Sequence, residues 1–207
     1  MFNVNNINQQ DRIELRVELG IKKDNFVVSY LGSIGTWYML DEMLLFFKQL
    51  LARKTNSLFF FITGEQQGLI FDKCNRYNIP IDSIIVKRAE RKDVPLYLSL
   101  SSLNIFFILP VYSKKASSPT KQGEVMGMGI PIVCNSGVGD TEEIIRNGNA
   151  GYVLDEFTEE AFNKLLNQIT DYPKSSENIR HAVKYFSLSE GVKRYNKIYQ
   201  HLLKNNN

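Results

Sequence analysis

The stretch Ser117–Asp140, SSPTKQGEVMGMGIPIVCNSGVGD, joins a helix start to a glycine-containing helix, a short apolar strand and a second glycine turn. Ser118 is a favourable N-cap and Pro119 a favourable first helical residue, so a helix is predicted to begin here. Backbone N–H groups at a helix start lack partners within the helix and lie at the positive end of its dipole. Three such groups are expected to face a bound anion: those of Thr120, Lys121 and Gln122.

Lys121 and Glu124 are three residues apart, so a cation and a carboxylate would share one face of this helix. A cation at a helix start is disfavoured by about 0.3–1 kcal/mol unless a negative group, such as a bound phosphate, lies nearby. The alternative is an ordinary exposed ion pair on a surface helix. Gly123 and Gly127 favour the ligand site, because each costs about 1 kcal/mol relative to Ala and indicates close approach by a ligand or another backbone. Tight packing of the helix on a sheet is the competing explanation.

Composition indicates a folded chain with one substantial core. Its 207 residues are 43% hydrophobic and 12% aromatic. A net charge of +3 gives no electrostatic footprint for nucleic acid, and no Asp-x-Asp pair points to a metal. The chain shows no secretory signal and no apolar run near the ~20 residues of a membrane-spanning helix, so a cytoplasmic location is expected.

Short apolar runs alternate with helical patterns from Asn25 onward, which is typical of βα units around a parallel sheet. Strands are predicted at Phe26–Leu31, Leu58–Ile62, Ser83–Val86, Leu103–Ile108, Pro131–Cys134 and Gly151–Leu154. Helices are predicted at Gln10–Leu19, Met39–Arg53, Gln66–Tyr77, Asp93–Leu100, Thr120–Met128, Asp140–Asn147, Thr158–Thr170, Ser175–Tyr185 and Ser189–Lys204. The expected fold class is α/β, a doubly wound, mainly parallel Rossmann-like sheet with extra C-terminal helices.

Loops after three of the strands would meet at the carboxyl edge of this sheet, where such folds bind ligands. The loop after the first strand could offer N–H and hydroxyl groups to a phosphate through Gly32, Ser33, Gly35 and Thr36. It lacks the third glycine of the dinucleotide fingerprint and the Gly-Lys-Ser/Thr ending of the P-loop. Lys87 and Arg88 follow the third strand and could border a nucleotide base, although solvated surface charges are the commoner explanation.

In order along the chain, these motifs resemble the C-terminal, nucleotide-sugar-binding half of retaining glycosyltransferases of the GT-B fold, those grouped as family 4. The matching segments are LRVELGI-KKDNFVVSYLGSIG, ITGEQ, SLSSLNIFFILP, PTKQGEVMGMGIPIVCNSGVGD and EEIIRNGNAGYVLD. The resemblance runs from about Gln10 to the end of the chain and is most specific from Pro119 to Asp140. It implies one half of a GT-B fold.

The resemblance also implies roles for site residues. In that family, two glutamates eight positions apart lie in the nucleotide-sugar site, and Glu124 matches the second, which holds the ribose hydroxyls. The first would fall on Ala116, so its sugar contacts do not carry over. The chain looks like the variant with Pro-Ser/Thr-Lys-x-x-Glu, in which Lys121 faces the diphosphate. No cofactor is implied beyond the nucleoside diphosphate sugar donor.

Three segments are expected. Residues 1–24 would form a leading segment with one helix, 25–174 the Rossmann-like nucleotide-sugar-binding domain, and 175–207 the C-terminal helices. The last helix carries an apolar stripe, and in GT-B enzymes such a helix commonly crosses to the N-terminal domain, which this chain lacks. The residues of the stripe are Val192, Tyr195, Ile198, Tyr199 and Leu202.

Two functions are therefore weighed. The first is a glycosyltransferase domain that binds a nucleoside diphosphate sugar, with UDP as a candidate nucleotide, for transfer of a hexosyl group to an acceptor glycan or lipid-linked sugar in surface polysaccharide synthesis. Peripheral membrane association of the full-length enzyme would fit this function. The second is a non-catalytic nucleotide-binding or partner-docking module. The departure at Ala116 and the missing half favour the module, whereas an upstream βα domain would favour the enzyme.

Overall fold

Six parallel strands form one sheet in the computed structural model, which describes residues 2–171, 179 and 186–204. The spatial order is β3-β2-β1-β4-β5-β6. The strands are β1 (Phe26–Leu31), β2 (Ser57–Ile62), β3 (Ile84–Lys87), β4 (Leu103–Phe106), β5 (Ile132–Asn135) and β6 (Gly151–Leu154). The predicted doubly wound α/β fold is confirmed.

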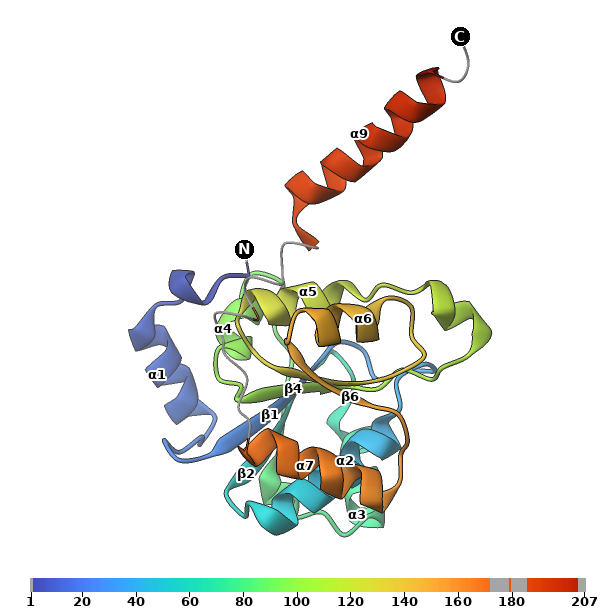
Figure 1. Ribbon diagram of the computed structural model, residues 1–207. Helices are drawn as coiled ribbons and strands as arrows, with labels where there is room; N and C mark the ends of the chain where they lie inside the picture. Colours follow the sequence, from blue (N-terminus) through green and yellow to red (C-terminus); the bar gives the residue numbers. More distant parts are fainter. Residues whose placement is uncertain (1, 172–178, 180–185, 205–207) are drawn as a thin grey trace.

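Helices cover both faces of this sheet. They are α1 (Gln9–Glu18), α2 (Leu40–Arg53), α3 (Gln67–Arg76), α4 (Val94–Leu98), α5 (Thr120–Gly127), α6 (Thr141–Asn147), α7 (Glu159–Asp171) and α9 (Leu188–Lys204). Figure 1 shows α5 and α6 over one face and α2 and α7 over the other. Three short 3₁₀ helices lie at Val4–Asn6, Ile81–Ser83 and Tyr112–Ala116.

The strands read as continuous apolar runs because helices bury both of their faces. In β2, Phe59, Phe60 and Phe61 are all 0% exposed, although neighbouring side chains in a strand point to opposite faces. Phe59 and Phe61 therefore share one face, with ring centroids 4.1 Å apart, while Phe60 stacks on Tyr97 from the other. Two-sided burial of this kind fixes the sheet as the centre of the core.

The fourth strand is shorter than its apolar run predicts. It was expected to extend to Ile108, but β4 ends at Phe106. Beyond that point the carbonyl of Phe107 accepts from Met39 N–H at 3.0 Å, and Ile108 forms an isolated antiparallel bridge with Tyr38. The Asn135 side chain then donates to and accepts from the Ile108 backbone at 2.9 and 2.8 Å. The segment stays extended because loops and a side chain replace the neighbouring strands.

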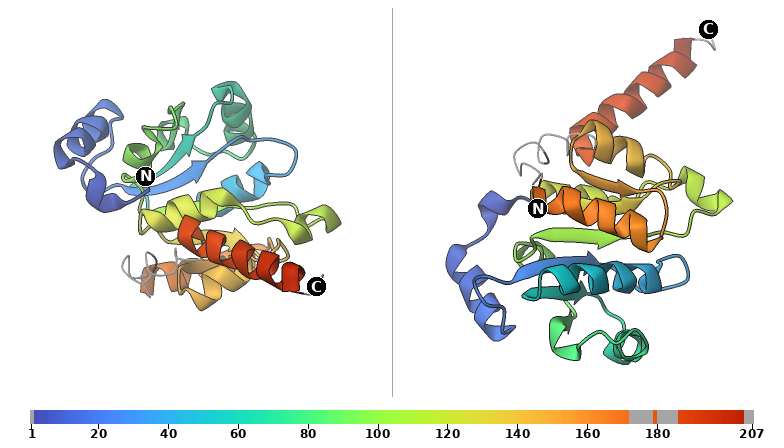
Figure 2. Two further views of the ribbon diagram at one scale, coloured as in Figure 1. Left: turned by 90° about the horizontal axis from the view of Figure 1, so that it is seen from above. Right: turned by 60° about the horizontal axis from the view of Figure 1, so that its bottom comes forward.

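Helix α9 projects from the body of the molecule (Figures 1 and 2) and contains no buried residue. The predicted apolar stripe lies on it and is exposed, with Tyr195 at 66% and Tyr199 at 60% exposure. The predicted helix Ser175–Tyr185 and the boundary between residues 174 and 175 lie outside the described residues, apart from Ile179, which is buried. Within the described residues no helix is both long and apolar enough to cross a membrane.

Candidate functional site

The candidate site lies at the carboxyl ends of β1 and β4, which are neighbours at the centre of the sheet. From β1 the chain continues outward through β2 and β3, and from β4 it continues outward through β5 and β6. Such a reversal of strand order is where open α/β sheets bind ligands, because the loops on either side diverge. Two predicted elements meet here, the loop after β1 and the start of α5.

Backbone contacts hold the loop after β1. Gly32 has a φ of 124°, a value that residues with a side chain rarely adopt. The Tyr30 hydroxyl donates to the Ser33 carbonyl at 2.6 Å, and Tyr38 N–H donates to the Gly35 carbonyl at 2.8 Å. With the loop held by these two hydrogen bonds, three of the predicted residues are exposed at the edge of the sheet: Ser33, Gly35 and Thr36.

Lys121 reaches from α5 into this loop. Its Nζ lies 3.7 Å from the centroid of the Tyr38 ring, 4.8 Å from that of Tyr30 and 6.0 Å from that of Phe106. The Tyr30 hydroxyl is 3.4 Å from Nζ. A Cβ on Gly32 would lie 2.8 Å from the same nitrogen, so a larger residue at position 32 would displace the ammonium from its place beneath the loop. The structure thus brings Gly32 and Lys121 together, as expected for a shared site.

Burial controls the electrostatics of this ammonium. Desolvation lowers the pKa of Lys121 to about 7, and the nearby charge of Glu124 opposes that shift. The three aromatic rings also oppose it, because their faces attract a cation. Burial raises the pKa of the Tyr30 hydroxyl, which therefore stays neutral. Among the described residues, no carboxylate lies within ion-pair distance of Lys121 Nζ.

Glu124 is paired with a different cation. Its Oε1 accepts from Nη2 of Arg91 at 2.6 Å, and the Glu124 side chain is only 14% exposed. The surface ion pair considered for Lys121 and Glu124 is therefore wrong, since Lys121 turns inward and Glu124 turns to the loop after β3. Arg91 was not singled out from the sequence. It lies in the charge run Lys87–Lys92, in which the pattern alone does not distinguish one cation from another.

The start of α5 differs from the expected cap. Pro119 is the N-cap and no side chain caps the helix, while the Ser118 hydroxyl bonds to Asp140 Oδ2 at 3.2 Å. The predicted Ser118 cap is wrong because this tertiary bond takes the hydroxyl away. Gln122 N–H donates to the Pro119 carbonyl at 3.0 Å, so it is not free for an anion as expected. The Gln122 side chain is buried and donates to the Thr141 carbonyl, whereas Thr120 is exposed.

The glycines inside α5 are explained by the packing of Phe186 and Phe2 against this helix. A Cβ on Gly123 would lie 2.5 Å from Cγ of Phe186, and a Cβ on Gly127 would lie 2.5 Å from the carbonyl oxygen of Phe2. Among the described residues, a side chain and a backbone segment thus fill the space beside these glycines. The expected close approach is present, and it is made by these two residues of the chain itself.

Lys87 and Arg88 lie at the end of β3 and just beyond it. Lys87 Nζ is 3.6 Å from Glu18 Oε1 at the end of α1, and both side chains are largely exposed. Arg88 is exposed. Their proposed place beside a nucleotide base stays a prediction.

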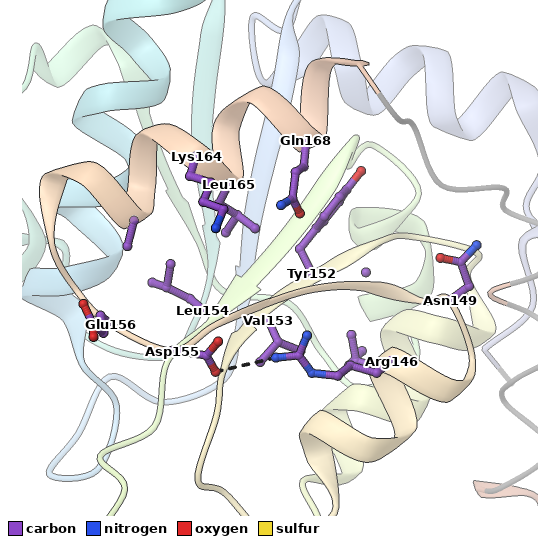
Figure 3. A pocket seen from close by; sticks show the side chains of 13 residues that line it. Arg146, Asn149, Tyr152, Val153, Leu154, Asp155, Glu156, Lys164, Leu165 and Gln168 are labelled. Carbon is purple, nitrogen blue, oxygen red and sulfur yellow. Dashed lines mark ion pairs between the residues drawn. The ribbon is translucent and has the colours of Figure 1, made fainter.

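A separate hollow of about 600 Å³ runs along the outer edge of β6, between α6 and α7. Arg146 and Asp155 form an ion pair of 3.5 Å at its rim (Figure 3). The hollow shares no residue with the Lys121 site. Within the described part of the chain, no cluster of three or more His, Cys, Asp or Glu side chains is arranged to hold a metal ion.

A model of the family described as "Glycosyl transferases group 1" matches residues 11–185. No curated protein sequence matches the chain. Solved structures do. WaaG, a glycosyltransferase involved in lipopolysaccharide biosynthesis, aligns with a TM-score of 0.70 and 19% identity, over 88% of this chain and 49% of WaaG.

Two further structures extend this comparison. The C-terminal domain of the group 1 family protein LpcC from Francisella tularensis gives a TM-score of 0.66 at 16% identity, over 89% of this chain and 94% of that domain. HepE from Anabaena, solved with UDP and glucose, gives 0.67 at 14% identity, over 89% of this chain and 50% of HepE. These likenesses show the fold. The chain spans about half the length of WaaG and HepE and nearly the whole of the isolated C-terminal domain.

Proposed function

Because this chain belongs to the family of group 1 glycosyl transferases, we propose that it is the half of such an enzyme that binds a nucleoside diphosphate sugar. UDP bound to HepE supports a uridine nucleotide as the first candidate donor. The proposed reaction transfers a hexosyl group, with retention of configuration, to an acceptor glycan or lipid-linked sugar of a surface polysaccharide. A cytoplasmic location stays a prediction.

The enclosed ammonium of Lys121 is the observation that carries this proposal. A buried charge is normally paired, because removing it from water costs several kcal/mol. Here aromatic rings surround the ammonium, and it faces no ion-pair partner in the described part of the chain. It lies beneath a loop whose exposed backbone faces the carboxyl edge of the sheet. A diphosphate bound over Gly32 would supply the missing negative charge.

The proposed roles follow from this placement. Gly32, Ser33, Gly35 and Thr36 would present N–H and hydroxyl groups to the diphosphate, and Thr120 would lie beside it at the start of α5. Lys121 would neutralise the charge that develops on the departing nucleoside diphosphate, which is the main catalytic task in such a transfer. Glu124 would accept hydrogen bonds from the ribose hydroxyls.

Transfer requires more than this chain supplies. Orienting donor and acceptor can contribute about 7–11 kcal/mol to lowering a barrier, and the chain spans only half the length of WaaG. We propose that a second GT-B domain holds the acceptor and that α9, with its exposed apolar stripe, packs against it. If the chain is instead a non-catalytic nucleotide-binding or partner-docking module, no sugar should be transferred even when a second domain is supplied.

The function is tested by thermal melting and calorimetric titration of the 207-residue chain with UDP-, GDP- and ADP-sugars. At a concentration one hundred times the dissociation constant, binding stabilises the fold by about 2.7 kcal/mol, which raises the melting temperature by roughly 5–10 °C. We expect one nucleotide series to bind and no sugar to be transferred by the chain alone. Absence of binding by all three series, or robust transfer by the isolated chain, would contradict the proposal.

Affinity for the donor is expected to fall as pH rises. The pKa of Lys121 is lowered to about 7 in the free chain, and a bound diphosphate would raise it, so binding takes up a proton near neutral pH. The dissociation constant should change little below about pH 6 and rise by up to roughly tenfold per unit above pH 7. A nucleoside diphosphate sugar suits the titration, because its phosphates keep their charge throughout this range. An affinity that does not change between about pH 6 and pH 8.5 would show that Lys121 stays charged in the free chain.

A further inference from the structure

We propose that Arg91 is a positioning residue for the ribose, holding one oxygen of the Glu124 carboxylate so that the other is presented to the sugar hydroxyls. This inference rests on the proposed function, since it assigns a supporting residue to the same site. The hydrogen bond is made by one oxygen only. Arg91 Nη2 bonds to Oε1 at 2.6 Å, and within the described residues no hydrogen bond is made to Oε2.

The guanidinium of Arg91 is itself held in place. Its central carbon lies 4.8 Å from the centroid of the Phe2 ring, an arrangement in which a planar cation packs on an aromatic face. Arg91 is 63% exposed, whereas its partner Glu124 is 14% exposed. An exposed arginine ordinarily samples many rotamers. Stacking on the Phe2 ring and a short charge-assisted hydrogen bond to Glu124 together restrict the Arg91 side chain to one conformation.

Phe2 is fixed against the same helix that carries Glu124. Its carbonyl oxygen would lie 2.5 Å from a Cβ on Gly127, so the N-terminal segment crosses α5 where only glycine leaves room. Gly127 and Glu124 are three residues apart and lie on one face of α5. Phe2 thus lies against α5 at Gly127 and stacks on Arg91, and Arg91 bonds to Glu124, so three segments that are distant in the sequence come together here.

This arrangement orders the carboxylate before a ligand arrives. A glutamate side chain loses up to about 1.5–2 kcal/mol of conformational entropy when it is immobilised, and prior ordering removes that cost from binding. The guanidinium also places a compensating positive charge beside this mostly buried carboxylate, whose oxygens accept hydrogen bonds. The ribose hydroxyls of a nucleotide, which donate hydrogen bonds, complement the remaining oxygen.

The test compares UDP and GDP with their 2′-deoxy and 3′-deoxy analogues by calorimetry, using Arg91→Ala, Arg91→Lys and Phe2→Ala. Lys92→Ala is the matched control, because Lys92 lies in the same loop, is 75% exposed and pairs only with Glu90 among the described residues. Arg91→Ala is expected to weaken the better-binding ribonucleotide by roughly tenfold, with little change for the deoxy analogue whose hydroxyl Glu124 holds. Arg91→Lys should restore part of this loss, Phe2→Ala should cost about threefold, and Lys92→Ala should have no effect.

A double-mutant cycle with Glu124→Ala separates this inference from the proposed function. If Arg91 acts through Glu124, replacing both should cost no more than replacing Glu124 alone. Loss of ribose selectivity in Glu124→Ala but not in Arg91→Ala would overturn the positioning role and leave the ribose anchor intact. If Glu124→Ala has no effect, the proposed ribose anchor itself is wrong, and the positioning role falls with it.

Two further outcomes would also overturn the inference. An Arg91→Ala variant that binds ribonucleotides more tightly would show that the arginine blocks the site. Equal weakening of ribonucleotides and both deoxy analogues would place Arg91 on the phosphates or the base. Thermal melting of each variant checks that these differences arise in the folded protein.

Discussion

Replacing Lys121 with Ala is expected to weaken binding of a nucleoside diphosphate by roughly 10- to 150-fold and to leave binding of the corresponding nucleoside unchanged. The lost interaction is a charge-assisted contact to phosphate, worth about 1.5–3 kcal/mol. The immediate neighbours of the ammonium cannot replace this charge, because they are the rings of Tyr30, Tyr38 and Phe106. Calorimetric titration with UDP and uridine, and then with GDP and guanosine, measures the contrast.

Lys121→Met is the companion variant. Methionine keeps the apolar stem among the aromatic rings and removes only the charge, so the free energy of unfolding at neutral pH should stay equal or rise, since burying the ammonium is costly. Diphosphate affinity should fall as far as in Lys121→Ala. Equal affinity of both variants and the unmodified chain for every diphosphate would remove Lys121 from the site. Parallel loss of diphosphate and nucleoside binding would instead indicate that the loop above Lys121 has collapsed.

Most of the fold could be predicted because burial on both faces leaves a strong pattern. The run Leu58–Ile62 contains three consecutive phenylalanines, which only a central strand between two helical layers can bury together. The errors lie at ends of elements, where tertiary contacts decide. The apolar run after Leu103 predicts a strand as far as Ile108, but the strand ends at Phe106. Ile108 pairs with Tyr38 and Asn135 in place of neighbouring strands, and neither partner is close to it in the sequence.

The candidate site was predictable in its outline and not in its pairings. The lone cation Lys121 and the glycine after the first strand identified two elements that the structure places in contact. The partners of each charge were not predictable, because they depend on loop paths. Ser118 satisfies a local capping rule, yet Asp140, 22 residues later, takes its hydroxyl. Glu124 meets Arg91, which is 33 residues earlier in the chain.

Gly139→Ala is expected to destabilise the fold by roughly 2–4 kcal/mol and to lower the melting temperature by about 5–15 °C. Gly139 lies in the turn between β5 and α6 with a φ of 45°, in the left-handed region. A Cβ there would lie 1.6 Å from the carbonyl oxygen of Ser117 and 2.7 Å from its carbonyl carbon. These are backbone atoms, so rotation of a side chain cannot relieve the overlap.

Gly139→Ala should also disturb the candidate ligand site, because Ser117 comes just before the helix that carries Lys121. Displacing Ser117 would shift Pro119, the N-cap of α5, and separate the Lys121 ammonium from the loop after β1.

Gly68→Ala is the matched control for the effect of Gly139→Ala on stability. Gly68 lies in α3, where an added Cβ would meet no atom within 4 Å, so alanine should stabilise the chain by up to about 1 kcal/mol. Denaturant unfolding measures both variants. A lower free energy of unfolding for Gly139→Ala and a higher one for Gly68→Ala would confirm that two backbones cross at Gly139. If Gly139→Ala were as stable as the unmodified chain, the turn and the segment before α5 could not lie in contact.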